Sequence, residues 1–341
     1  MTLYPSDTWA CASPTDVGLS SDRLAAVEQW LEESAGETGY RFALVKDGLL
    51  VAQIHRGIDP SNHLSIASAA KSAYSNVLGI AVEEGVLPSA DAPVVEIYPE
   101  MMDVAPDEGP KAGRHAFAKD AAITYRQLIC NVSGYMKPGE EPGKVFHYQT
   151  YGMNVLTHAV AKAYGSYDIS DPAGSPGFAS LIETKIADPI GARFSYALTN
   201  FDLHAKAQLP IFGYYCQICT DPLDLARLGW LWCNWGAWRD RQVVPEAWVR
   251  ESVKVNDFIL VNEPEDRWVY GHGFWSNSRG VMWPDLPRDA FTAAGAGGHY
   301  VSVFPSQRLV VVQNPGPYDN LRKGARRANG DLLEMVLDAL V

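Results

Sequence analysis

Two side chains that could do covalent chemistry lie one helical turn apart at the start of an apolar segment, "SIASAAKSAYSNVLGIAVEEG" (65–85). Ser68 and Lys71 fit the pattern S-x-x-K, whose serine and lysine share one helix face with Cβ atoms about 5–6 Å apart. Burial of Lys71 would lower the pKa of its ammonium from about 10.4 towards 7–8, so that it could take or steer the proton of Ser68. The alternative interpretation is a solvated lysine on a helix flank. The small neighbouring residues favour a nucleophilic serine, because they let another segment approach it closely.

Other sequence patterns with catalytic or ligand-binding chemistry are missing or incomplete. G-x-S-x-G and H-E-x-x-H do not occur, and the eight histidines do not cluster with carboxylates at metal-ligand spacing. Cys216 and Cys219 form a lone C-x-x-C without a second ligand pair, so we interpret them as ordinary buried cysteines. The glycine-rich "GAGG" (295–298) leads into a predicted strand, whereas a dinucleotide fingerprint opens a helix. We therefore expect no metal and no organic cofactor.

Composition and charge restrict the classes of partner. The chain has 341 residues, 47% of them hydrophobic, and a net charge of −12, which argues against a nucleic acid or an anionic membrane as partner. No apolar run reaches the roughly 18 residues of a membrane span, and the amino terminus has no basic and apolar export signal. The five scattered cysteines suit a reducing compartment. We expect a cytoplasmic protein that acts on a small molecule.

The elements that must position Ser68 follow from hydrophobic periodicity. Residues 20–34 are predicted to form an amphipathic helix, and two strands should flank the turn Lys46-Asp47-Gly48. Residues 76–254 are predicted to be mainly helical, with the tryptophans of "LGWLWCNWGAW" in a helix core. Residues 291–314 are predicted to form two strands around a Pro-Ser turn, and 329–341 a closing helix.

This order predicts an α/β (α+β) fold in which strands from both ends of the chain join one antiparallel sheet, flanked by the terminal helices. We expect a single catalytic domain of two lobes. An α/β lobe would comprise about 1–75 and 255–341, and a mainly helical lobe about 76–254. The ligand site is expected in a cleft between the lobes.

Three further stretches follow the S-x-x-K segment in a fixed order. They are "ITYRQLICNVSGY" (123–135), "PGKVFHYQTYGMNVL" (142–156) and "CTDPLDLARLGWLWCNWGAWRDRQVVPEAW" (219–248). Together with Ser68 and Lys71 they resemble the serine β-lactamase and penicillin-recognising superfamily, over nearly the whole chain. The resemblance is to its class C β-lactamase-like branch, which includes esterases, D-aminopeptidases, 6-aminohexanoate-dimer-hydrolase-like amidases and transacylases. It implies a serine β-lactamase-like fold.

The resemblance also implies roles for individual residues. Ser68 matches the family nucleophile, Lys71 its partner, and Tyr148 of "FHYQT" the tyrosine that shuttles a proton; the alternative is that Tyr148 only packs a loop. The backbone N–H groups of Ser68 and Ala296 match the two donors of the oxyanion hole.

Two departures from the family pattern bear on the substrate. Thr150 replaces the asparagine of Y-x-N, and Ala293 replaces the lysine or histidine that meets a penicillin carboxylate. Both departures count against β-lactamase or cell-wall peptidase activity. Gly295 and His299 on the same strand as Ala293, and Thr150, are predicted substrate-binding residues. Three tryptophans could shape a less charged pocket: Trp268, Trp275 and Trp283.

The sequence thus predicts a serine hydrolase that cleaves a carboxylic ester or amide through an acyl-enzyme on Ser68. An acyltransferase would use the same acyl-enzyme, with an amine or alcohol in place of water. A non-catalytic binding protein on the same fold is a third possibility, disfavoured because Ser68, Lys71 and Tyr148 are all present.

Overall fold

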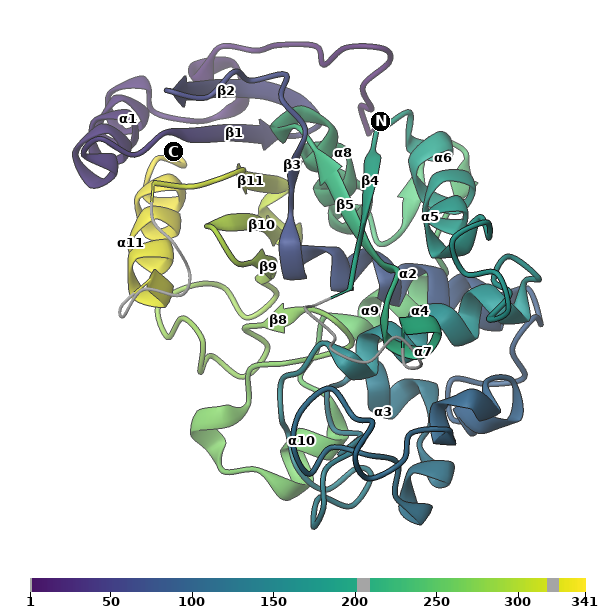
Figure 1. Ribbon diagram of the computed structural model, residues 1–341. Coiled ribbons are helices and arrows are strands. Elements are labelled where there is room, and N and C mark those ends of the chain that lie inside the picture. Colours follow the sequence, from purple (N-terminus) through teal and green to yellow (C-terminus); the bar gives the residue numbers. More distant parts are fainter. Residues whose placement is uncertain (1, 201–208, 318–324) are drawn as a thin grey trace.

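The computed structural model describes residues 2–200, 209–317 and 325–341 (Figure 1). The helices are α1 (Ser21–Ala35), α2 (Ala70–Glu83), α3 (Tyr125–Ile129), α4 (Tyr151–Ala163), α5 (Gly177–Ile182), α6 (Asp188–Ile190), α7 (Leu209–Phe212), α8 (Pro222–Cys233), α9 (Glu246–Ser252), α10 (Asp257–Asn262) and α11 (Ala325–Asp338). The strands are β1 (Tyr40–Lys46), β2 (Leu49–Arg56), β3 (Leu64–Ser65), β4 (Ser195–Thr199), β5 (Tyr215–Thr220), β6 (Ala237–Trp238), β7 (Arg241–Gln242), β8 (Trp275–Ser276), β9 (Phe291–Gly295), β10 (His299–Phe304) and β11 (Leu309–Gln313).

Six strands from the two ends of the chain form one antiparallel sheet, in the order β2-β1-β11-β10-β9-β8. The first strand of the chain pairs with the last, with Leu44 opposite Val311. In Figure 1 the purple β1 accordingly lies beside the yellow-green β11. The prediction of a single sheet made from both ends of the chain is confirmed.

The two faces of the sheet are covered by different helices because side chains alternate along each strand. Phe42 and Leu44 of β1 pack in one cluster with α1 and α11, whereas Ala43 and Val45 face the main core. On that second face α8 crosses the sheet so closely that a Cβ on Gly229 would lie 2.5 Å from Val310 Cγ1. The buried Trp230 and Trp232 of α8 belong to this core, as predicted, whereas Trp235 follows the end of α8 and Trp238 lies in β6. The sheet therefore lies between the terminal helices and α8.

Helix α2 is the central helix of the molecule. Every residue from Ala70 to Ala81 is buried, as expected for a helix that packs against protein on all sides. Its neighbours include α9, whose Trp248 ring contacts Gly79 so closely that a Cβ there would lie 2.4 Å from the ring. The segment that carries Lys71 is therefore rigidly held, and Lys71 enters the interior with it.

The structure differs from the sequence expectation in two places. Residues 291–314 form three strands, not two, because the turn at 296–298 separates β9 from β10 before the Pro-Ser turn. The region expected to be mainly helical also holds the short pair β6 and β7, and the strands β4 and β5, which form a three-stranded sheet with β3 from outside this region. Strand β5 contains the predicted buried cysteines; Cys216 is buried and Cys219 is half-buried.

The boundaries of the two lobes stay a prediction. Helix α8 covers the six-stranded sheet, although its residues lie in the range expected for the helical lobe. Among the residues placed by the structure, no helix has the length and apolar character needed to cross a membrane.

Candidate active site

Ser68 lies in a single turn of 3-10 helix, Ala67–Ala69, that leads directly into α2. Ala67, the residue before it, has a φ of 48°, a left-handed conformation that costs a non-glycine residue of order 1 kcal/mol or more. The Ala67 N–H is 3.3 Å from Ser65 Oγ, which accepts a hydrogen bond from it. This strained turn carries the half-buried Ser68 out of the helix axis, beside the end of β9.

The side chains of Ser68 and Lys71 are in direct contact. Lys71 Nζ donates a hydrogen bond of 2.7 Å to Ser68 Oγ. Lys71 is only 1% exposed, and none of the carboxylates in the described part of the chain forms an ion pair with it. The i, i+3 spacing read from the sequence thus brings amine and hydroxyl together on one helix face.

Burial of Lys71 changes its protonation. Desolvation lowers the pKa of the ammonium to about 7, because a charge removed from water without a counter-ion is disfavoured. A large fraction of the Lys71 side chains is therefore neutral near pH 7 and able to accept a proton. The environment of Lys71 is suited to a general base and unsuited to a structural cation.

Tyr148 is the third predicted residue that the structure brings to this point. Lys71 Nζ lies 4.9 Å from the centre of the Tyr148 ring. Burial raises the pKa of the Tyr148 hydroxyl to about 12, and a hydrogen bond with the Ser68 side chain opposes that rise. At neutral pH the phenol is therefore protonated, as a proton donor must be. The two pKa values favour Lys71 over Tyr148 as proton acceptor.

The Tyr148 ring is held by aromatic side chains that sequence reasoning did not assign to this role. The Tyr270 ring meets it edge-on at 5.7 Å, and the Trp275 ring lies 5.6 Å away on β8. Trp275 was expected only as a pocket residue; Tyr270 was not singled out. Both are far from Tyr148 in sequence and belong to no recognisable motif.

Asn131 fixes the backbone on which Tyr148 sits. It has a φ of 57°, and its backbone and side-chain carbonyl oxygens accept hydrogen bonds from the N–H groups of His147 and Gln149, both 2.9 Å long. Its Nδ2 donates to Tyr270 Oη at 3.2 Å. Asparagine tolerates the left-handed conformation better than most residues. Its position in "ICNVSGY" was the only signal in the sequence that could have identified it.

The end of β9 packs against the turn that carries Ser68. A Cβ on Gly295 would lie 2.0 Å from Ile66 O and 3.0 Å from Ala69 N, so only glycine allows this approach. Ala296 follows Gly295 at the start of the turn 296–298. The predicted oxyanion donors, the N–H groups of Ser68 and Ala296, thus belong to two segments in contact. Their convergence on one oxygen stays a prediction.

The remaining predicted residues lie in different surroundings. Thr150 is half-buried and lines a cavity of about 310 Å³ that also reaches Tyr148. His299 is buried, with Nδ1 3.2 Å from Asn314 Oδ1, and so belongs to a polar network at the end of the sheet. Ala293 is fully buried within β9, opposite Val301. A substrate-binding role for Thr150, Gly295 and His299 stays a prediction.

No group of metal-ligating side chains occurs among the residues placed by the structure. Ser68, Lys71 and Tyr148 bring a hydroxyl beside an uncharged amine and a phenol. This arrangement can attack an electrophilic carbon and move the proton of that hydroxyl to a leaving group.

The sequence of this chain matches a known protein family. A family model described as Beta-lactamase matches residues 24–313. No curated protein matches the chain.

Solved structures with the same fold include three that differ in assigned activity. The first is provisionally named a 6-aminohexanoate-dimer hydrolase, from Bacillus anthracis (15% identity, TM-score 0.67, 98% of this chain and 88% of that one covered). The second is a family VIII carboxylesterase (16%, 0.64, 95% and 99%). The third is a β-lactamase from Mycobacterium bovis (18%, 0.62, 94% and 100%). At these identities the likeness shows the fold alone.

Proposed function

The chain belongs to the β-lactamase family, and on this basis we propose that it is a serine hydrolase that cleaves a carboxylic ester or amide through an acyl-enzyme on Ser68. The observation that carries the proposal is the 2.7 Å hydrogen bond between Lys71 Nζ and Ser68 Oγ, made by a buried amine that forms no ion pair with any residue in the described ranges. Burying an unpaired amine is costly, and a structural role would be served as well by an apolar residue.

The proposed reaction moves one proton around the site. Neutral Lys71 accepts the proton of Ser68 as Oγ attacks the carbonyl carbon, and the oxyanion is held by the N–H groups of Ser68 and Ala296. Tyr148 donates a proton to the leaving nitrogen or oxygen as its bond to carbon breaks, and is reprotonated from Lys71. Water then attacks the acyl-enzyme by the reverse sequence, releasing the carboxylic acid and restoring the Ser68 hydroxyl.

The proposed substrate of this chain is a carboxylic ester or an open-chain amide and not a β-lactam. The buried Ala293 occupies the position at which relatives carry the lysine or histidine that meets a penicillin carboxylate. Thr150 replaces the longer asparagine that holds an amide in those relatives. Among proteins of the same fold, the carboxylesterase and the 6-aminohexanoate-dimer hydrolase are consistent with this preference. The five free cysteines support a cytoplasmic location.

We expect a fluorophosphonate to label Ser68, detected as a mass increase on the peptide that contains it. The same preparation should hydrolyse short-chain esters or amides of amino acids faster than a β-lactam. Absence of an adduct would favour a non-catalytic binding protein, and strong β-lactam hydrolysis would contradict the interpretation of Ala293 and Thr150. Added amines or alcohols then distinguish a hydrolase from an acyltransferase, because only the latter diverts most of the acyl group from water.

The pH dependence of ester hydrolysis should report the protonation of Lys71. Because only neutral Lys71 accepts a proton and its pKa is lowered to about 7, kcat/KM should rise about ten-fold per pH unit below 7 and level off above 8. The Tyr148 pKa of about 12 predicts no loss of activity from its ionisation below about pH 11. Initial rates between pH 5 and 10, corrected for hydrolysis without enzyme, test this. A value of kcat/KM that does not change with pH below 7 would exclude Lys71 as the general base.

A further inference from the structure

A cavity lined by several basic residues has Tyr148 in its wall, and Ser68 is not among its lining residues. Its volume of about 310 Å³ is at the lower end of the range for small-molecule sites, about 300–1,000 Å³. Tyr148 and Thr150 line one side. The basic residues that line the rest are Lys111, Arg114, Lys137 and His147. In a chain with a net charge of −12, three lysine and arginine side chains around one small cavity form a local reversal of charge.

Two of these cations have no partner in the part of the chain that the structure describes. Neither Lys111 nor Arg114 forms an ion pair or a side-chain hydrogen bond there. Arg114 is half-buried, so part of its hydration has been lost without replacement. A guanidinium has five N–H donors in a planar fork that matches a carboxylate. An arginine without an ion pair in a cavity wall can therefore bind an anionic ligand, to which it donates hydrogen bonds.

Lys137 adds a charge from below the cavity surface. It is 3% exposed, and its Nζ forms an ion pair with Glu140, whose Oε2 lies 3.3 Å away. Burial lowers the pKa of the Lys137 ammonium to about 8, with the charges of Arg114 and Lys119 acting in the same direction and Glu140 opposing them. The ammonium has three donors, and Glu140 is its only partner among the residues that the structure describes.

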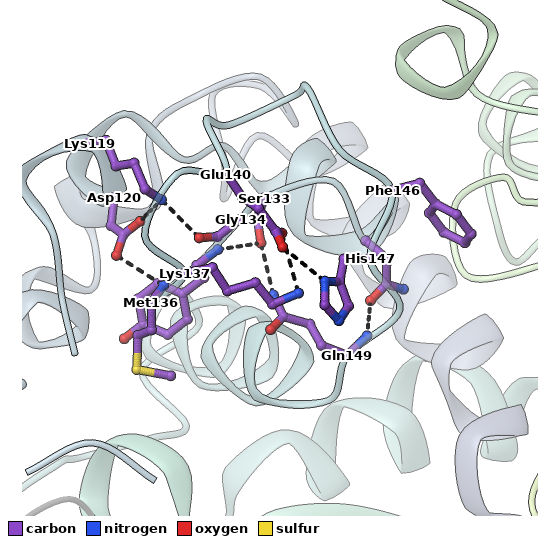
Figure 2. Close-up of polar contacts among 12 residues, drawn as sticks. Lys119, Asp120, Ser133, Gly134, Met136, Lys137, Glu140, Phe146, His147 and Gln149 are labelled. Carbon is purple, nitrogen blue, oxygen red and sulfur yellow. Dashed lines mark hydrogen bonds and ion pairs between the residues drawn. The ribbon is translucent and has the colours of Figure 1, made fainter. Parts of the chain in front are cut away.

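The nearby carboxylates neutralise this charge only in part. Glu140 faces both Lys137 and His147, whose Nδ1 lies 3.0 Å from Glu140 Oε1 (Figure 2). Asp120 is engaged by Lys119, with Nζ 2.8 Å from its Oδ1. Glu140 thus meets one of the three lining cations, and Lys111 and Arg114 remain uncompensated. The cavity keeps a positive potential.

We propose that this cavity binds a carboxylate on the leaving group of the substrate, through Arg114 and the charge of Lys137. The inference rests on the proposed function and specifies its substrate class: esters or amides whose alcohol or amine portion carries an acid group, such as amides of amino acids. A carboxylate seated there would receive charge-assisted hydrogen bonds from Arg114, which are about twice as strong as neutral ones.

The side of the scissile bond follows from the position of Tyr148. In the proposed reaction Tyr148 gives its proton to the leaving atom, so the leaving group departs past Tyr148. Tyr148 lines the cavity, with Gln149 and Thr150 beside it. An anion in the cavity therefore belongs to the leaving group, and the acyl group lies on the other side of Ser68.

Two matched pairs of esters test the assignment. In the first pair, 4-carboxyphenyl acetate and its neutral analogue 4-carbamoylphenyl acetate, the charge is on the leaving group. In the second, phenyl succinate and phenyl succinamate, it is on the acyl group. Each kcat/KM is divided by the rate constant for hydroxide, which removes the difference in intrinsic reactivity. We expect a preference for the carboxylate of about ten-fold or more in the first pair only.

Three variants assign the preference to the cavity. Arg114→Gln and Lys137→Met should each lower the carboxylate-to-amide ratio about ten-fold, and Arg114→Lys should keep part of it. Lys144→Gln removes an exposed positive charge from the same loop, outside the cavity lining, and should leave the ratio unchanged. Thermal unfolding of each variant identifies effects of folding, and the ratio is measured within one preparation.

The outcomes separate the two proposals. Three outcomes would overturn the leaving-group assignment while the enzyme stays a hydrolase. They are a carboxylate-to-amide ratio near one in the first pair, a preference confined to the second pair, and a ratio that Arg114→Gln and Lys137→Met leave unchanged. If the wild type turns over none of the four esters faster than Ser68→Ala does, the proposed function itself is wrong.

Discussion

Replacing Ser68 with alanine is expected to reduce ester and amide turnover by about 10⁴-fold or more. Removal of a nucleophile eliminates the covalent route entirely and leaves only binding and oxyanion stabilisation. Ser68 is half-buried, and its hydroxyl contacts Lys71 and Tyr148, residues that are held independently by α2 and by Asn131. The variant should therefore fold normally. Steady-state rates over a thousand-fold range of enzyme concentration would measure the loss.

The matched control is Ser306→Ala, which removes an exposed serine hydroxyl from the turn between β10 and β11. It should retain full activity and should still be labelled at Ser68. Near-ultraviolet circular dichroism and the melting temperature establish that Ser68→Ala keeps the native packing. Substantial turnover by a folded Ser68→Ala protein would exclude an acyl-enzyme on this residue.

Lys71→Met is expected to lose activity and to gain stability. Without the proton acceptor, kcat/KM should fall about 10²–10⁴-fold. The buried ammonium meanwhile destabilises the wild type, because the pKa of Lys71 is about 7 in the folded chain and 10.5 for an ordinary lysine in water. Methionine fills the same volume with no charge to desolvate. An inactive variant that melts above the wild type would identify Lys71 as a residue kept for chemistry.

The sign of the effect on stability depends on pH. Between pH 7 and 10.5 the unfolded chain binds the Lys71 proton and the folded chain does not, so wild-type stability rises with pH across this window. At pH 8 the destabilisation is about 3–4 kcal/mol, because each of the roughly 2.5 pH units below the unfolded pKa contributes about 1.4 kcal/mol. The advantage of Lys71→Met should be large at pH 8 and almost vanish by pH 10.5.

Denaturant unfolding of both proteins at a series of pH values measures this difference directly, since other groups titrate alike in both. Lys144→Met, at an exposed lysine, is the control and should show no pH-dependent difference from the wild type. An advantage of Lys71→Met that stays constant between pH 8 and 10.5 would mean that Lys71 is charged in the folded protein.

The secondary structure that follows a clear period could be predicted from the sequence. Helix α1 begins after Ser20, whose Oγ accepts a hydrogen bond from the Arg23 N–H, and β1 and β2 flank the expected Asp47-Gly48 turn. The small sheet β3-β5-β4 was missed because β3 has only two residues and its one partner, β5, lies more than 100 positions away. Such pairing leaves no local signal. The separation of β9 from β10 was missed because residues 291–304 were counted as one strand before the Pro-Ser turn, although the glycine-rich "GAGG" lies within them.

The candidate site likewise contains some residues that the sequence identifies and others that it does not. Ser68 and Lys71 could be found because three residues along a helix are neighbours in space, and Tyr148 because it lies in a recognisable motif. Asn131, Tyr270 and the unpaired Arg114 could not be assigned roles. Their positions depend on the packing of loops that the hydrophobic pattern does not describe. The burial that lowers the pKa of Lys71 is likewise a property of the whole fold.

The pairing of β1 with β11 has a consequence for synthesis on the ribosome. The amino-terminal hairpin emerges early, but its partner strand ends at Gln313, and the Gly295 segment that packs against the Ser68 turn also emerges late. Because domains fold when their contacts become available, the nascent chain carries Ser68 and Lys71 without a competent reaction centre for most of translation. Newly made protein should acquire activity in one step, after the last strands have left the exit tunnel.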